Sequence, residues 1–254
     1  MKRSSRVVLV LAIGFLFMVA VIPARAEIIE KSDQWKNFLS VYGWAQALNG
    51  DVKIKGIDSD INQSFSDFWS NAKFSFGAHY EGFTGHWGIM VDGFYYSYEI
   101  EKDHPGGAVP GRRQLKFQQT LVELDVPYRF MWTPVVADVF IGGRYNNIYG
   151  EIGVPSVPVK RDDTLAFFDP IVGARVFIPL DKRWYLGLRG DIGGFGIGNA
   201  SDMALNGNIF VNWQITSLVS TQLGFRAFYM KYNEGENEWN ATQWGPWLGV
   251  GFSF

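Results

Sequence analysis

The chain has 254 residues, a formal charge of −2 and no cysteine, which excludes disulfides, lipid-modified cysteines, thiol nucleophiles and cysteine-based metal sites. The nearly neutral charge excludes a strong electrostatic attraction to nucleic acid. Aromatic residues make up 17% of the chain, yet the mean hydropathy is −0.02. This combination is typical of a membrane barrel, in which apolar and polar residues alternate.

The first 26 residues have the layout of a secretory signal peptide. Lys2, Arg3 and Arg6 form a basic start, residues 7–21 are apolar, and residues 24–26 read Ala-Arg-Ala, a small-residue cleavage motif. The sequence therefore predicts that residues 1–26 are removed and that residues 27–254 form one domain. After residue 26 no apolar run approaches the length of a membrane helix. A membrane location would then require a closed barrel.

The rest of the chain shows segments of period-two alternation that are separated by turn-rich breaks. We expect an all-β, antiparallel up-and-down transmembrane barrel of ten strands, with eight or twelve as alternatives. The breaks alternate between long and short, as extracellular loops and periplasmic turns do, and an even strand number returns the C-terminus to the periplasm. The expected strands cover residues 38–50, 72–83, 87–101, 114–130, 136–150, 164–179, 184–198, 203–216, 219–232 and 241–254.

The last segment shows the alternation most clearly. Leu248, Val250, Phe252 and Phe254 fall on one face, whereas small or polar residues occupy most of the other. This ending resembles the C-terminal signature of outer-membrane barrels, and the whole layout resembles the broad class that contains OmpA-, OmpX- and OmpW-type proteins. The resemblance implies that Phe252 and Phe254 are read by the barrel-assembly machinery. It also implies an outer-membrane location with periplasmic termini and contacts to outer-membrane lipids and lipopolysaccharide.

Projecting the alternation inward places many charged side chains in the lumen. Each would be costly to bury alone, so we expect pairing or hydration. A salt-bridged filling and a selectivity lining for a narrow channel are the two interpretations, and large inward groups such as Phe94, Phe140 and Trp247 favour the filling. The predicted lumen network comprises Glu81, Asp92, Glu123, Asp125, Asp138, Arg144, Asp169, Arg175, Arg189, Asp191 and Arg226, and Lys73 and Arg129 are also expected to point inward.

The longest break, residues 51–71, contains Phe65, Phe68 and Trp69, which one helical turn after Ser64 would bring together. Such an apolar patch should not stand in water. One hypothesis is that the loop folds into the barrel mouth as a plug. The alternative is that residues 52–55 extend the first strand beyond the membrane as part of a longer hairpin.

Nothing in the sequence indicates catalysis, a cofactor or a metal site. His86 falls in a predicted periplasmic turn, His104 in an extracellular loop, and His79 points inward beside Glu81, which lumen hydrogen bonding explains. The glycine-rich run 193–198 lacks the Lys and Ser/Thr of a phosphate loop. The acidic loop 233–238 lacks the spacing of a calcium loop and is interpreted as a solvated loop.

The predicted function is that of a non-enzymatic outer-membrane barrel with a structural or surface-interaction role and a largely filled lumen. The alternative is a narrow channel for small solutes that loop 51–71 plugs, and a barrel enzyme is the third candidate. No nucleic-acid partner is expected.

Overall fold

The computed structural model describes residues 34–63, 72–104, 111–154 and 159–254, so the predicted signal peptide and the predicted helical turn after Ser64 lie outside the described residues. Within these ranges no helix is long and apolar enough to cross a membrane. The strands are β1 (Lys36–Trp44), β2 (Ala47–Ile54), β3 (Ile57–Gln63), β4 (Ala72–Thr84), β5 (Trp87–His104), β6 (Gly111–Trp132), β7 (Val135–Val154), β8 (Val159–Pro179), β9 (Trp184–Gly194), β10 (Met203–Gln214), β11 (Val219–Glu234) and β12 (Asn237–Ser253).

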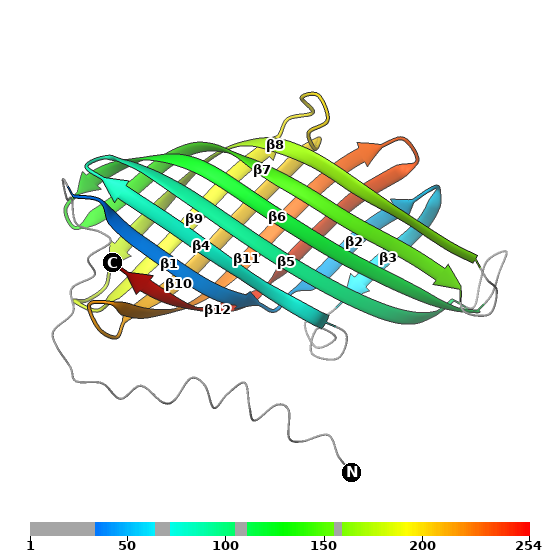
Figure 1. The fold of residues 1–254 in the computed structure, drawn as a ribbon, viewed down its shortest axis with the longest axis horizontal. Coiled ribbons are helices and arrows are strands. Elements are labelled where there is room, and N and C mark those ends of the chain that lie inside the picture. The colour runs from blue at the N-terminus through cyan, green and yellow to red at the C-terminus, as the bar shows by residue number, and fades with distance from the viewer. Residues whose placement is uncertain (1–33, 64–71, 105–110, 155–158) are drawn as a thin grey trace, which may run out of the picture.

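Ten of the described strands form a closed antiparallel barrel (Figure 1). Strands β4 to β12 pair in sequence, and β1 closes the ring by pairing with both β4 and β12. Leu39, for example, lies opposite Tyr80 on one side and Phe252 on the other. The predicted ten-stranded barrel is confirmed, and the strands β2 and β3 are an addition to it.

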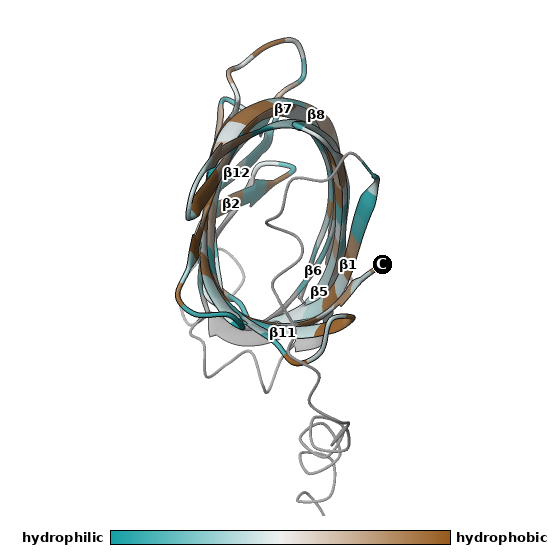
Figure 2. Cartoon of the chain, turned by 90° about the vertical axis from the view of Figure 1, so that its left-hand side faces the viewer, coloured by the Kyte–Doolittle hydropathy of each residue, from teal (hydrophilic) through white to brown (hydrophobic). Residues whose placement is uncertain are grey.

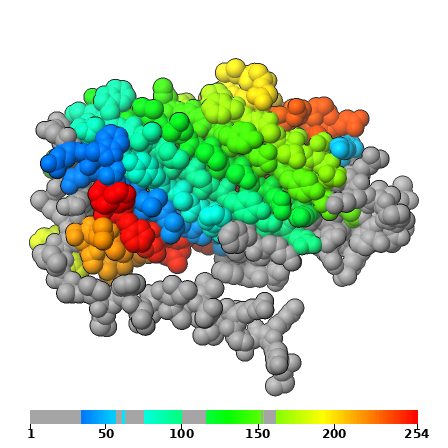
Figure 3. Space-filling model, in the orientation of Figure 1, coloured from blue at the N-terminus to red at the C-terminus, as the bar shows by residue number. Residues whose placement is uncertain are grey.

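The wall alternates between an apolar outer face and a mixed inner face. On β12, Leu248 and Val250 are exposed on the outside, whereas Trp247, Gly249 and Gly251 are buried on the inside. The side of the barrel in Figure 3 is an unbroken surface across the neighbouring strands β5 to β8. A band of exposed apolar side chains around a closed ring is what a bilayer requires of a spanning sheet.

The two ends of the barrel differ in the length of their connections. Short turns after β4, β6, β8 and β10 gather at one end, together with the C-terminus and the start of β1 (Figure 1), and we call this the turn end. At the opposite loop end, β6, β7 and β8 run for 22, 20 and 21 residues. A tilted strand crosses a bilayer in roughly 9–11 residues, so these three strands project well beyond one.

The strand expected over residues 184–198 ends earlier than predicted. At Gly194 the backbone has a φ of +88°, and at Phe195 it has a φ of +66°, which no strand accommodates. The tight turn that follows is held by the Ala200 N–H, which donates to the Ile197 carbonyl at 3.0 Å. Phe195 and Ile197 are therefore exposed on a turn and not on a strand.

The expected first strand, 38–50, is present as β1 and β2. Trp44 pairs with Trp247 and Ala47 pairs with Trp244, so both segments keep one register along β12. They are separated at Ala45, whose N–H still donates to the Pro246 carbonyl at 2.9 Å. Beyond Tyr42, however, the other neighbour changes from β4 to β3.

Residues 51–63 form the arm of a β-hairpin, as the alternative interpretation of this segment predicted. Lys55 and Gly56 form its tip, with φ angles of +47° and +77°, as a two-residue hairpin turn needs. Viewed along the barrel, β2 lies inside the outline of the ring (Figure 2). Ile54 reaches β7 on the opposite wall, because a Cβ built on Gly150 would lie 2.5 Å from the Ile54 Cδ1 atom. The hairpin therefore crosses the barrel mouth while β2 continues the first strand. Phe65, Phe68 and Trp69, on which the plug hypothesis is based, lie outside the described residues.

Candidate functional site in the barrel lumen

The first ion-pair group lies near the turn end, and we call it the turn-side cluster. Arg129 binds the Asp138 carboxylate with two hydrogen bonds, from Nε at 2.8 Å and from Nη2 at 2.9 Å. Arg175 donates from Nε to the same carboxylate at 2.7 Å and pairs through Nη2 with Glu81. The guanidinium carbon of Arg129 lies 3.6 Å from the ring centroid of Phe83. Planar guanidinium groups suit such bidentate and stacked contacts better than lysine does.

The second group, the central cluster, lies one layer further from the turn end. Arg144 is fully buried and binds Glu123 at 2.8 Å through Nε and Asp191 at 2.6 Å through Nη2. Arg189 donates to Asp191 at 3.1 Å, pairs with Glu123, and contacts Asp125 at 3.2 Å. Five charged side chains from β6, β7 and β9 thus pair with one another inside the lumen, although the Asp125 Oδ1 and Arg144 Nη1 atoms are buried without a hydrogen-bond partner.

Two residues of the predicted network occupy the edge of these clusters. Asp92 accepts a hydrogen bond from the Tyr42 hydroxyl at 2.9 Å and lies 3.3 Å from the Nδ1 atom of His79. Arg226 donates from Nε to the Asn206 Oδ1 atom at 2.9 Å, and its Nη1 atom lies 3.9 Å from Asp92. Both line an internal cavity that is described below.

Asp169 is buried as expected, but it forms no ion pair with a basic residue of the described ranges. Its Oδ1 atom instead accepts the backbone N–H of Ser201 at 2.7 Å, and Asn146 donates to its Oδ2 atom at 3.4 Å. Asp169 therefore caps the turn between β9 and β10. The side chain of Lys73 lies outside the described residues.

One residue outside the predicted lumen network, Asn206 of β10, also belongs to it. In the structure Asn206 bridges the central cluster and Arg226, because its Nδ2 atom donates to Asp191 at 2.7 Å while its Oδ1 atom accepts from Arg226. The alternation of β10 placed this side chain correctly, but alternation alone carries no information about which strand across the lumen supplies its partners.

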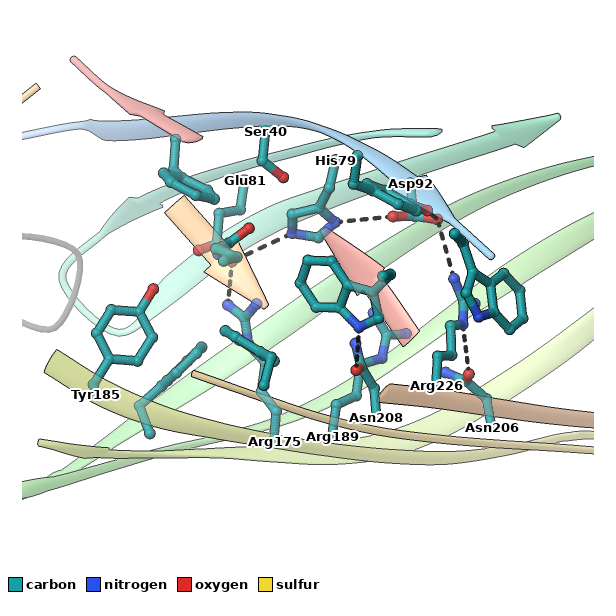
Figure 4. Close-up of a pocket in the computed structure, with 17 residues that line it drawn as sticks. Ser40, His79, Glu81, Asp92, Arg175, Tyr185, Arg189, Asn206, Asn208 and Arg226 are labelled. Carbon is teal, nitrogen blue, oxygen red and sulfur yellow. Dashed lines mark hydrogen bonds and ion pairs between the residues drawn. The ribbon is translucent and has the colours of Figure 1, made fainter. Parts of the chain in front are cut away.

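A cavity of about 80 Å³ lies between the clusters and the first strand (Figure 4). Its lining includes polar side chains such as His79, Asp92 and Arg226 and aromatic side chains such as Phe210 and Trp247. By the criterion that one water needs about 10–15 Å³, it holds roughly five water-sized groups. It is a pocket in the lumen and far smaller than a channel.

The loop-end half of the lumen is apolar. The inward side chains of Val52, Ile54 and Ile61 on the hairpin belong to one buried cluster with residues of the opposite wall. Phe167 and Tyr232 stack within it with ring centroids 3.9 Å apart. The cluster also includes Phe94, Phe117, Leu121, Ile148, Leu165, Phe228 and Trp239.

Asn237 fastens the hairpin tip to this end of the barrel, and we call its contacts the Asn237 latch. Its Oδ1 atom accepts the backbone N–H of Lys55 at 2.8 Å, and its Nδ2 atom donates to Asp163 of β8 at 3.0 Å. The Gly56 N–H donates to the Glu236 carbonyl at 3.1 Å. The hydrogen bond from Asn237 holds the pKa of the Asp163 carboxyl below its usual range.

The two histidine side chains that the structure describes each lie beside polar groups of neighbouring strands. His79 lies inside the lumen between Asp92 and Glu81, at 3.3 and 3.8 Å, and His86 has its Nδ1 atom 2.7 Å from the Arg129 carbonyl oxygen. The side chain of His104 lies outside the described residues. Across the part of the chain that the structure describes, no group of three or more His, Asp or Glu side chains is arranged to hold a metal ion.

The two residues of the predicted assembly signal both lie on the outer face. Phe252 and Phe254 are exposed to 39% and 65%. The backbone of Phe254 pairs with Asn37, with N···O distances of 2.9 and 3.0 Å, so the C-terminal residue completes the ring at the turn end.

The sequence matches no protein-family model and no curated protein. Among solved structures, the chain is similar to the outer membrane protease OmpT of Escherichia coli, with a TM-score of 0.54, 8% identity, and coverage of 89% of this chain and 98% of that one. Ail, the attachment invasion locus protein of Yersinia pestis, gives a TM-score of 0.42 at 11% identity, with 87% and 99% coverage. A major outer membrane protein of Thermus thermophilus gives 0.43 at 13%, with 87% and 100% coverage. At these identities the likeness concerns the fold alone, which is that of small outer-membrane β-barrel proteins.

Proposed function

We propose that this chain is a non-conducting, non-enzymatic outer-membrane barrel with a structural or surface-interaction role. The observation that carries the proposal is the β2–β3 hairpin, which crosses the mouth and buries its apolar side chains against the opposite wall. A conducting barrel needs a continuous wet path through its lumen. The hairpin stands in such a path.

The ion-pair clusters support the same proposal at a second level. Arg129, Arg144, Asp138 and Glu123 are each exposed to 2% or less, so they occupy the cross-section of the barrel and do not line a water column. Hydrated pore charges keep contact with water, whereas these charges meet one another. The lumen therefore has a polar seal and an apolar seal in series.

Membrane insertion is supported by the closed ring and by its apolar outer face, on which Ile141, Leu223 and Leu248 are exposed to 60% or more. The proposed location is the outer membrane, after removal of residues 1–26, with the turn end in the periplasm. The long strands β6, β7 and β8 then project outward. They are the part of the molecule that we expect to meet lipopolysaccharide or a partner at the surface.

The test is single-channel recording of the refolded protein in a planar bilayer. Replacing Val52–Ser59 with Asn-Gly joins the paired residues Asp51 and Asp60 through a two-residue turn, and so shortens the hairpin without changing its register. We expect no conductance steps from the wild type or from the control Lys55→Gln. Discrete steps in the wild type would overturn the proposal.

Steps that appear only in the shortened hairpin would identify the hairpin as the decisive seal, and silence in both would assign the decisive seal to the ion-pair clusters. Heat-dependent gel mobility verifies that each variant has folded. The non-enzymatic part is tested separately by incubating the refolded barrel with peptide and phospholipid substrates. Turnover that His79→Gln abolishes would contradict it.

A further inference from the structure

The internal cavity contains a guanidinium group whose hydrogen-bonding capacity is largely unused. Arg226 is 8% exposed, and its only hydrogen bond to a described residue is the 2.9 Å contact from Nε to Asn206. Its Nη1 atom stays 3.9 Å from Asp92, beyond hydrogen-bond distance. Arg129 and Arg144, by comparison, each have carboxylate contacts below 3 Å. The Nη groups of Arg226 therefore remain available to a further acceptor.

Asp92 does not act as that acceptor because other donors already hold it. The Tyr42 hydroxyl donates to its Oδ1 atom at 2.9 Å, and His79 lies 3.3 Å from its Oδ2 atom. Figure 4 shows the contact of His79 with Asp92, and Arg226 on the other side of Asp92. The carboxylate is thus anchored to the first strand and to β4.

A second donor lies directly beside Arg226. Asn208 is its cross-strand partner in the β10–β11 register, and the Trp247 indole N–H donates to the Asn208 Oδ1 atom at 2.9 Å. That contact fixes the orientation of the amide, since an indole can only donate. Asn208 lines the cavity, and its NH₂ group has no hydrogen bond to a described residue. This group is therefore a second available donor next to the guanidinium.

The same wall supplies an apolar surface directly beside these donors, because Phe210 and Trp247 flank Gly224 in the row next to Asn208 and Arg226. The rings of Phe210 and Trp247 lie with centroids 5.5 Å apart, and Tyr42 contacts Trp247 edge to face at 5.8 Å. A cavity of about 80 Å³ has room for roughly five water-sized groups. A ligand must therefore combine a planar acceptor head with only a few apolar atoms.

We propose that this cavity binds a short-chain monocarboxylate, such as one of the size of propionate. Its two oxygens would accept from the Arg226 Nη groups and the Asn208 amide, in the planar arrangement that guanidinium groups favour for carboxylates. Its hydrocarbon end would lie against Phe210 and Trp247. A phosphate dianion suits the site less well, because only one unsatisfied cation is present among the described residues that line the cavity, and Asp92 lies close to it.

The cavity spans the lumen from the turn-side cluster, through Glu81 and Arg175, to Trp44 and Trp247 of the apolar cluster. The cavity lining extends to Phe38 and Tyr185, which lie near the short turns and the chain ends, whereas the loop end is filled by the hairpin cluster. The site is therefore a closed recess and not a step in a conduction path. It stands independently of whether the hairpin blocks ions.

The experiment is ligand-observed saturation-transfer NMR on the refolded barrel in detergent micelles. Propionate is titrated beside propionamide, which has the same shape without the charge. Inorganic phosphate carries no observable proton, so its affinity is measured by its competition with the propionate signal. We expect saturable binding of propionate in the millimolar range or tighter, at least ten-fold tighter than propionamide or phosphate. No saturable propionate binding, or equal binding of propionamide, would overturn the proposal, and tighter binding of phosphate would replace it with a general anion site.

Two variants locate the site. Asn208→Asp preserves size and replaces donors with a repelling carboxylate, and Arg226→Gln removes the cation. Each should weaken propionate binding at least ten-fold. The control is Lys231→Gln, which removes a positive charge from the same strand at an exposed position 3.9 Å from Asp202 and should leave binding unchanged. If Arg226→Gln does not refold, Asn208→Asp decides, and wild-type affinity in that variant would contradict the assignment.

Discussion

The two halves of the lumen are filled by different means. In the half nearer the turn end, side chains of the wall strands cross the interior as ion pairs, and Arg144 and Asp138 have no exposed surface. In the half nearer the loop end, the wall is supplemented by a hairpin whose Val52, Ile54 and Ile61 meet apolar side chains. The packing of the first half depends on the pairing of individual charges, whereas the packing of the second half depends on the docking of the hairpin. Single substitutions should therefore damage the two halves in different ways.

The largest effect is expected in the charged half. Arg144→Ala should lower the free energy of unfolding by about 3–5 kcal/mol, because it leaves Glu123 and Asp191 buried with one partner fewer. Arg189→Ala should act in the same direction. Urea unfolding in detergent micelles, followed by tryptophan fluorescence, measures both.

The matched control for these variants is Lys182→Ala, which removes a charge from an exposed turn and should unfold like the wild type. Wild-type unfolding profiles for both arginine variants would show that the ion pairs add nothing to stability.

The apolar half should respond locally. Ile54→Ala removes a side chain that crosses the mouth to Gly150 and should destabilise the docked hairpin by about 2 kcal/mol. The hairpin would then open without unfolding the barrel, so trypsin should cleave after Lys55 faster than in the wild type. Val41→Ala changes an exposed residue on the outer face of β1, the strand that continues into β2, and should leave the cleavage rate unchanged. An equal acceleration in this control would contradict the docked hairpin.

A smaller effect is expected from the Asn237 latch. Asn237→Ala removes the contacts to Lys55 and Asp163. It should lower the free energy of opening at the Lys55 amide by ~1 kcal/mol, the contribution of about one hydrogen bond, and so speed hydrogen exchange there. Because the folded pKa of Asp163 is lowered, its contribution is present above the unfolded value of about 3.9 and is lost as the pH falls through the folded value. The protection factor at Lys55, which is the intrinsic exchange rate at each pH divided by the observed rate, should therefore fall at acidic pH in the wild type. A protection factor that stays constant would rule out the carboxylate contact.

The smallest effect is expected at the exposed pair of Lys231 and Asp202, which are 3.9 Å apart. Lys231→Gln should change the free energy of unfolding by less than about 0.5 kcal/mol, since screened surface pairs contribute little. A loss comparable with that of Arg144→Ala would mean that burial does not separate the important charges from the unimportant ones.

The alternation of the sequence was sufficient to predict the ten-stranded wall and the inward position of residues such as Glu123, Arg144 and Asp191. It could not predict partners, because a period of two specifies a face and not a position around the ring. Asp169 illustrates this limit: it points inward as expected, but a backbone N–H of Ser201 takes the place of an arginine.

The hairpin was harder to predict for a related reason. Leu48, Val52 and Ile54 keep the parity of the first strand, so the pattern is the same whether the segment continues in the wall or turns into the mouth. The deciding feature is that the pairing of β1 with β4 stops at Tyr42, and this depends on tertiary structure. Likewise, the early end of the strand predicted over 184–198 follows from the left-handed backbone at Phe195, an uncommon conformation for a residue other than glycine.

The single register shared by β1 and β2 along β12 has a consequence for assembly. The contact between the first and last strands closes the ring, and the same contact, continued past Ala45, positions the stem of the hairpin. Formation of this seam therefore also places the stem of the hairpin at the barrel mouth. Under the proposed function, a barrel whose first and last strands have not yet met would lack the segment that crosses its mouth.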